Sequence, residues 1–209
     1  MGITTFIHHF ERGTEKNKLQ SRPLLLLHGT GGNEKSLLWL GREVCPGASI
    51  LSVRGKVTEN GMPRFFRRFA ENVLDEDDVR CRALDLADFV TSAGKQYGIY
   101  PPVALGYSNG ANMALAVLQL RPEIFAGVIL LRSAMIPISL TALPNLADKP
   151  ILIISGTYDP TILADRFCNL LAQLRRCGGQ VTHKIVPVGH ELSEEDVALS
   201  RDWFENTKF

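Results

Sequence analysis

The stretch Gly106-Tyr107-Ser108-Asn109-Gly110 decides the fold of this chain. It follows an apolar run at residues 103–105 and precedes a helix-like run at residues 111–120. A serine between two glycines at such a junction predicts a tight strand-to-helix turn, with its hydroxyl at the end of a sheet. Side chains at positions 106 and 110 would collide with this turn. So short a pattern also occurs by chance in unrelated sequences. A hydrolase interpretation therefore requires a base, an acid and oxyanion donors elsewhere in the chain.

Strand-like and helix-like runs alternate on both sides of this turn. After an edge strand at residues 4–10, strands are expected at 23–27, 49–53, 103–105, 126–131, 151–155 and 181–186. Helices are expected at 34–41, 75–97, 109–121, 161–176 and 193–205. This alternation predicts an α/β fold, a mostly parallel central sheet with helices on both faces and a minimal cap or none. With 209 residues, one domain over residues 1–209 is expected.

Residues 56–75 break the alternation. This segment contains the aromatic and arginine-rich run Arg64-Phe65-Phe66-Arg67-Arg68-Phe69. A long loop in a compact domain is often functional, which favours a substrate-binding loop or small lid. A solvated, amphipathic surface helix is the alternative, and both interpretations stay open. If the segment lines a pocket, the candidate substrate-contacting residues are Arg54, Met62, Phe65, Phe66 and Met135.

Composition excludes several function classes. The net charge of +1 gives no reason to expect nucleic acid or an anionic membrane as a partner. The cysteines at 45, 81, 168 and 177 are widely spaced without a histidine cluster, so no metal site is expected and free thiols of a cytoplasmic protein are favoured. No apolar run approaches the ~18 residues needed to cross a bilayer. The sequence does not decide between a monomer and a homodimer.

Three reactive residues follow three of the expected strands. Ser108 follows residues 103–105, Asp159 follows 151–155, and His190 follows 181–186. The carboxyl ends of parallel strands meet along one edge of a sheet, so these side chains should come together there. A serine hydroxyl needs a base to become nucleophilic, a histidine can supply it, and an aspartate orients the imidazole. The sequence therefore predicts a catalytic triad.

Backbone N–H groups should stabilise the oxyanion of such a reaction. Asn109, directly after the serine, is one expected donor, and Thr30 in His28-Gly29-Thr30-Gly31-Gly32 is the other. His28 is interpreted as structural.

Other acids and bases are poorly placed. Asp165 lies inside an expected helix, Asp148 precedes a strand, and His183 lies within a strand. The Gly31-Gly32 loop lacks the pattern of a phosphate cradle, so no cofactor is expected.

With these residues in hand, the chain resembles the phospholipase/carboxylesterase family of α/β-hydrolases. The matching stretches are LLLLHGTGGNE, RGKVTENGMPRFFRR, GYSNGANMA, SGTYDP and VGHELS. They look closest to the bacterial carboxylesterase subgroup associated with quinone-resistance operons. The resemblance implies a triad of Ser108, Asp159 and His190. Asn109 departs from the thioesterase branch, where glutamine is usual, and Ser108 replaces the cysteine of dienelactone hydrolases.

The expected function is hydrolysis of small carboxylic esters through an acyl-enzyme, without metal or organic cofactor. An acyl thioesterase or lysophospholipase is the alternative within the enzymes. A non-catalytic ligand sensor on a hydrolase scaffold is the alternative from another class.

Overall fold

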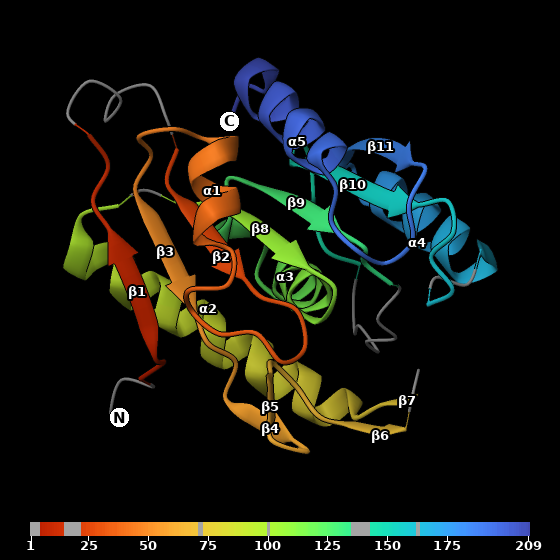
Figure 1. Ribbon diagram of the computed structural model, residues 1–209, viewed down its shortest axis with the longest axis horizontal. Coiled ribbons are helices and arrows are strands. Elements are labelled where there is room, and N and C mark those ends of the chain that lie inside the picture. Colours follow the sequence, from red (N-terminus) through yellow and green to blue (C-terminus); the bar gives the residue numbers. More distant parts are fainter. Residues whose placement is uncertain (1–4, 15–21, 71–72, 100, 135–142, 162–163) are drawn as a thin grey trace.

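The computed structural model describes residues 5–14, 22–70, 73–99, 101–134, 143–161 and 164–209, without the side chains of residues 164–166. A seven-stranded sheet runs through the molecule in the order β1-β3-β2-β8-β9-β10-β11 (Figure 1). Its strands are β1 (His8–Glu11), β2 (Leu24–Leu27), β3 (Ile50–Val53), β8 (Val103–Tyr107), β9 (Gly127–Leu131), β10 (Pro150–Gly156) and β11 (Gln180–Val186). Only β1, at one edge, pairs antiparallel. The mostly parallel sheet expected from the sequence is therefore confirmed.

Helices cover both faces of this sheet (Figure 1). They are α1 (Leu38–Val44), α2 (Glu76–Tyr97), α3 (Asn109–Leu120), α4 (Ala164–Arg176) and α5 (Glu194–Asn206), with a short 3-10 helix, η2 (Pro122–Ile124). Alternate residues of β2 illustrate the two cores. Leu25 and Leu27 pack in the cluster that contains α2, α3 and α4, whereas Leu24 and Leu26 pack in the cluster that contains α1 and α5. Burial on both faces explains why this strand is an uninterrupted apolar run.

Helix ends follow the local sequence. Asp75 caps α2 by accepting a hydrogen bond from the Asp78 N–H (3.1 Å), and acidic residues in the first turn complement the helix dipole. Ser193 and Asp196 form a reciprocal capping box at the start of α5. The helix expected from residue 34 begins later, at Leu38. The Asn33 side chain instead accepts from the Lys35 N–H (2.8 Å) and forms a turn.

The segment that breaks the alternation forms two small hairpins. β4 (Val57–Glu59) pairs with β5 (Met62–Arg64), and β6 (Arg68–Ala70) pairs with β7 (Val73–Leu74). The amphipathic surface helix is therefore wrong for these residues. Asn60 and Gly61, both at positive φ, form the tight turn between β4 and β5, as expected of an Asn-Gly dipeptide.

Candidate active site

The turn between β8 and α3 holds Ser108 in a strained backbone conformation. Its φ is 53° and its ψ is −115°, a combination that costs a non-glycine residue about 1–3 kcal/mol. The glycines of the motif are needed for close approach. A Cβ at Gly106 would lie 2.6 Å from backbone atoms of Ala111, and one at Gly110 would lie 2.0 Å from the carbonyl oxygen of Leu27. These contacts press the turn against the loop that follows β2.

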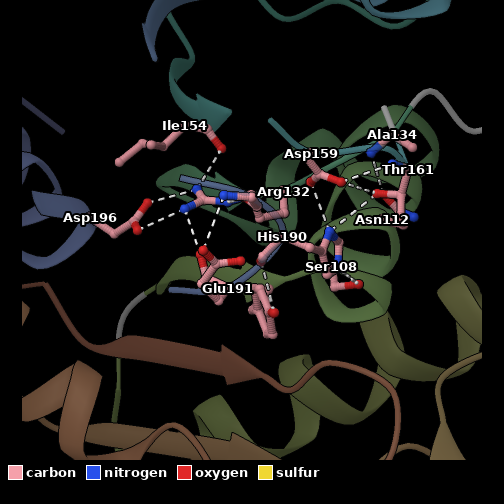
Figure 2. A network of polar contacts seen from close by, with 12 residues as sticks. Ser108, Asn112, Arg132, Ala134, Ile154, Asp159, Thr161, His190, Glu191 and Asp196 are labelled. Atoms are coloured by element: carbon pink, nitrogen blue, oxygen red, sulfur yellow. Dashed lines mark hydrogen bonds and ion pairs between the residues drawn. The ribbon is translucent and has the colours of Figure 1, made fainter. Parts of the chain in front are cut away.

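A continuous hydrogen-bond chain joins the three reactive residues (Figure 2). The distance from Ser108 Oγ to His190 Nε2 is 2.8 Å, and from His190 Nδ1 to Asp159 Oδ2 it is 2.7 Å. The Asp159 side chain is fully buried and that of His190 is one-third exposed. The acid is thus shielded while the histidine and serine stay accessible. In this geometry Nδ1 donates to the carboxylate and Nε2 can accept the hydroxyl proton.

Thr161 completes the surroundings of the acid, a role that sequence reasoning missed. Its hydroxyl donates to Asp159 Oδ1 at 2.6 Å and its N–H donates to the same oxygen at 2.9 Å. Burial alone would raise the pKa of Asp159, but the hydrogen bonds from Thr161 and His190 outweigh it and lower that pKa. The Asp-Pro-Thr spacing allows a side chain to bond the backbone two residues on, so a signal was present.

The two expected oxyanion donors belong to different elements of the fold. Asn109 is the first residue of α3, and Thr30 lies in the turn after β2. Within the described ranges, no residue accepts a hydrogen bond from the backbone N–H of either. The neighbouring N–H groups are occupied, since Gly31 donates to Pro63 O (2.9 Å) and Gly32 to Gly29 O (3.0 Å).

The β4–β5 hairpin and the residues after it are anchored to both of these donor regions. Pro63 O accepts from the Gly31 N–H, Arg64 Nη1 donates to Thr30 Oγ1 (3.0 Å), and the Phe65 N–H donates to Asn109 Oδ1 (2.8 Å). The Asn109 side chain, which differs from the glutamine usual in the thioesterases, therefore ties this segment to the residue next to Ser108.

The expected substrate-contacting residues lie in different surroundings. Met62 is partly exposed, and its side chain lies against Gly31 of the turn after β2. Phe65 and Phe66 are buried in the core beneath the hairpin. Arg54 forms a bidentate pair with Glu34 (2.6 and 3.0 Å). Met135 lies outside the described residues. Substrate contact stays a prediction for all five.

His28 joins the turn after β2 to Gly55, which follows β3. Its Nδ1 lies 2.6 Å from Gly29 O, and its Nε2 accepts from the Gly55 N–H at 3.0 Å. Since Nε2 must accept, Nδ1 carries the proton and the ring is neutral. Burial also lowers the pKa of His28. The structural interpretation of this histidine fits its contacts.

A second serine–histidine pair lies within the sheet. Ser155 Oγ and His183 Nε2 are 3.1 Å apart on neighbouring strands β10 and β11. No carboxylate of a described residue bonds this histidine, and Ser155 is 7% exposed. The pair lacks the acid and the access that a nucleophile requires.

The described residues meet the requirements of neither a metal centre nor a membrane-spanning helix. Across the described parts of the chain, no three His, Cys, Asp or Glu side chains form a group that could hold a metal ion. Among the same residues, no helix is both long and apolar enough to span a membrane.

Comparison with known proteins places this geometry in a family. The protein named "Putative hydrolase MhqD" from Bacillus subtilis is 41% identical over 200 residues, which cover 95% of this chain and 97% of that protein. The chain belongs to the phospholipase/carboxylesterase family of α/β-hydrolases. No known family profile matches the sequence.

Solved structures agree with this membership. The carboxylesterase of Bacillus cereus superposes on this α/β-hydrolase with a TM-score of 0.90 and 40% identity, covering 96% of this chain and 93% of that one. The carboxylesterase of Mesorhizobium loti gives 0.82 and 30%, covering 89% of each chain. This α/β-hydrolase is a carboxylesterase-type enzyme, a carboxylic ester hydrolase.

Proposed function

We propose that this protein hydrolyses small carboxylic esters through a covalent acyl-enzyme on Ser108. The observation that carries the proposal is the continuous chain Asp159–His190–Ser108, with both of its distances below 3 Å. His190 bonds to both Asp159 and the strained Ser108. A surface histidine and a turn-forming aspartate would have no reason to form such a chain. The three residues follow three strands. Along the sequence they come in the order serine, aspartate, histidine, which is typical of α/β-hydrolases.

In the first half-reaction, Ser108 Oγ attacks the ester carbonyl while His190 Nε2 takes the hydroxyl proton. Asp159 stabilises the resulting imidazolium and holds its tautomer. The N–H groups of Thr30 and Asn109 stabilise the tetrahedral oxyanion, where losing one such donor costs about 3–4 kcal/mol. His190 then protonates the alkoxide leaving group, and the alcohol departs.

In the second half-reaction, water attacks the acyl-Ser108 carbonyl. His190 again accepts a proton, now from the water, and returns it to Ser108 Oγ as the carboxylic acid forms. Each proton removed in one half-reaction is given back in the same half-reaction. No metal or organic cofactor is required.

The substrate class rests on the small size of the inserted segment. Residues 56–75 form two short hairpins, and the first is bonded to the oxyanion turn. We propose that they act as a fixed wall of the substrate site, with Met62 beside the oxyanion turn. A thioester is the second candidate substrate, because the same triad cleaves both. A ligand sensor would not need the complete triad.

We also propose a cellular location and a domain organisation for this enzyme. The cysteines of the described chain form no disulfide, which favours a reducing, cytoplasmic environment. Residues 1–209 form a single domain, and a homodimer is the alternative to a monomer.

A fluorophosphonate probe and a series of p-nitrophenyl esters test the proposal. We expect the native protein to be labelled and to hydrolyse short esters faster than long ones, with a thioester assayed alongside. Ser108→Ala should abolish both labelling and hydrolysis. Ser155→Ala is the matched control and should keep both. Equal labelling of native protein and Ser108→Ala would refute the proposal.

A further inference from the structure

The loop that carries His190 is held by side chains from two other strand ends. Residues 187–193 lie between β11 and α5 without regular structure. Three consecutive carbonyl groups of this loop each accept a side-chain hydrogen bond. Gly189 O accepts from Arg132 Nε (3.0 Å), His190 O from Tyr107 Oη (3.0 Å), and Glu191 O from Arg132 Nη2 (2.8 Å).

Arg132 uses its whole guanidinium group for this purpose (Figure 2). Besides the two loop carbonyls, Nη1 donates to Asp196 Oδ1 (2.7 Å) and Ile154 O (3.4 Å), and Nη2 donates to Asp196 Oδ2 (2.9 Å). An arginine side chain has five N–H donors, and each has an acceptor. The group is therefore saturated by protein atoms and has no donor left for a substrate.

Asp196 ties the far end of the loop to the same centre. Its Oδ2 accepts from both the N–H and the hydroxyl of Ser193, each at 2.8 Å. One carboxylate thus joins the start of α5 to Arg132. The side chains of Arg132 and Asp196 are both fully buried. The backbone of Arg132 has a φ of 55°, which a non-glycine residue rarely adopts.

A buried ion pair is poor evidence for stability, because desolvation offsets its attraction and apolar pairs often serve as well. Here the arginine contacts peptide carbonyls on both sides of His190. We infer that Arg132, with Asp196 as its counter-ion, is a positioning residue for His190. It fixes the backbone from which the imidazole reaches both Ser108 and Asp159. The inference rests on the proposed function, since it assigns a role toward the same histidine.

The test uses a pair of substitutions that leaves no unpaired buried charge. Arg132→Met/Asp196→Asn removes the guanidinium, while the asparagine oxygen can still accept from Ser193. We expect kcat to fall about 10- to 100-fold with KM within about twofold, as for a small misplacement of a catalytic group. Arg132→Lys should retain more of the rate. Arg201→Met, which removes an exposed pair between Arg201 on α5 and Glu43 on α1, is the matched control and should keep native kcat.

A spectroscopic readout separates positioning from stability. The proton between His190 Nδ1 and Asp159 should give a downfield proton NMR signal in native protein. It should shift or broaden in the double variant and remain unchanged in Arg201→Met. A variant that is merely less stable, but folded at the assay temperature, would keep the native signal and kcat.

The outcomes distinguish the positioning role of Arg132 from the esterase proposal. A native protein that fluorophosphonate fails to label would refute the triad and the positioning role together. If the native protein is labelled and the folded double variant keeps its signal and kcat, the positioning role is wrong and the esterase proposal stands. If the double variant does not fold, Arg132→Lys decides. Native kcat in Arg132→Lys would overturn the inference, and a several-fold loss of kcat with native KM would support it.

Discussion

At Asp159, burial and hydrogen bonding act in opposite directions on one carboxyl group, and hydrogen bonding prevails. The lowered pKa of Asp159 keeps the group ionised at neutral pH. An ionised acid can stabilise the imidazolium that forms during catalysis. Any stability that this carboxylate contributes is present above its unfolded pKa of about 3.9 and is lost as pH falls through its lower folded pKa.

We predict that Asp159→Asn lowers kcat about 10³- to 10⁴-fold, because an amide favours the wrong histidine tautomer. Steady-state hydrolysis of a short p-nitrophenyl ester measures the loss, and unfolding curves check the fold. Asp148→Asn, at an exposed position outside the site, should keep kcat within about twofold. Near-native turnover of Asp159→Asn would move the acid elsewhere.

Thr161 supplies a milder test of the same carboxylate. Thr161→Val removes the hydroxyl bond to Asp159 Oδ1 and keeps the backbone bond. Losing a hydrogen bond to a charged group costs about 1.5–3 kcal/mol, so kcat should fall about 10- to 100-fold. Thr161→Ser retains the hydroxyl and should restore most of the rate. Equal rates for the valine and serine variants would show that the hydroxyl has no role.

The buried imidazole of His28 makes folding stability depend on pH. Its pKa is lowered by burial, so the unfolded chain takes up a proton first as pH falls below about 6.5. Folding stability should then decrease, by at most about 1.4 kcal/mol per pH unit for one proton. Urea unfolding at pH 7.5 and 5.5 should show a smaller decrease for His28→Gln than for native protein. Burial also lowers the pKa of His183, so adding His183→Gln should reduce the decrease further.

At the scale of elements, the β4–β5 hairpin and the residues after it are bonded to the turn after β2 and to the start of α3. Pro63, Arg64 and Phe65 each bond to the turn after β2 or to the first residue of α3. Phe65 also packs 4.8 Å from the ring of His28. A segment with these anchors should move little, so it sets the shape of the site in advance of binding.

We predict that Asn109→Ala loosens this segment and keeps the Asn109 backbone donor. The Phe65 N–H loses its acceptor, so KM for longer esters should change more than kcat for the shortest ester. Asn206→Ala, whose amide bonds Asp202 within α5, is the control. Native chain-length preference in Asn109→Ala would show that the anchor does not shape the substrate site.

At the scale of the whole molecule, the two cores share one sheet. Each central strand contributes alternate residues to both clusters. Arg22 near the start of β2 also bonds to Phe209 O at the chain end (3.0 Å). Loss of the sheet would therefore remove both cores together.

We predict a single thermal unfolding transition with equal calorimetric and van't Hoff enthalpies. Esterase activity, measured through the same temperature range, should disappear in that transition. Two resolved transitions, or activity that is lost well before unfolding, would indicate that residues 56–75 or another part of the chain form a separate unit.

The sequence by itself determined the architecture and predicted which three residues form the catalytic triad. Buried parallel strands are continuous apolar runs, and their carboxyl ends share an edge, so Ser108, Asp159 and His190 could be placed together from their order alone. The acidic start of α2 and the capping box of α5 likewise depend only on residues close together in sequence. The hairpins within residues 56–75 were not recognised, because strands of two or three residues leave no measurable periodicity.

Only the tertiary structure decided which side chains hold that trio in place. Arg132 meets Asp196, 64 residues later, and Asn109 meets Phe65, 44 residues earlier. A buried polar group must find a partner, but no repeat or local pattern says which one. The partner depends on which strand ends and loops the fold brings together.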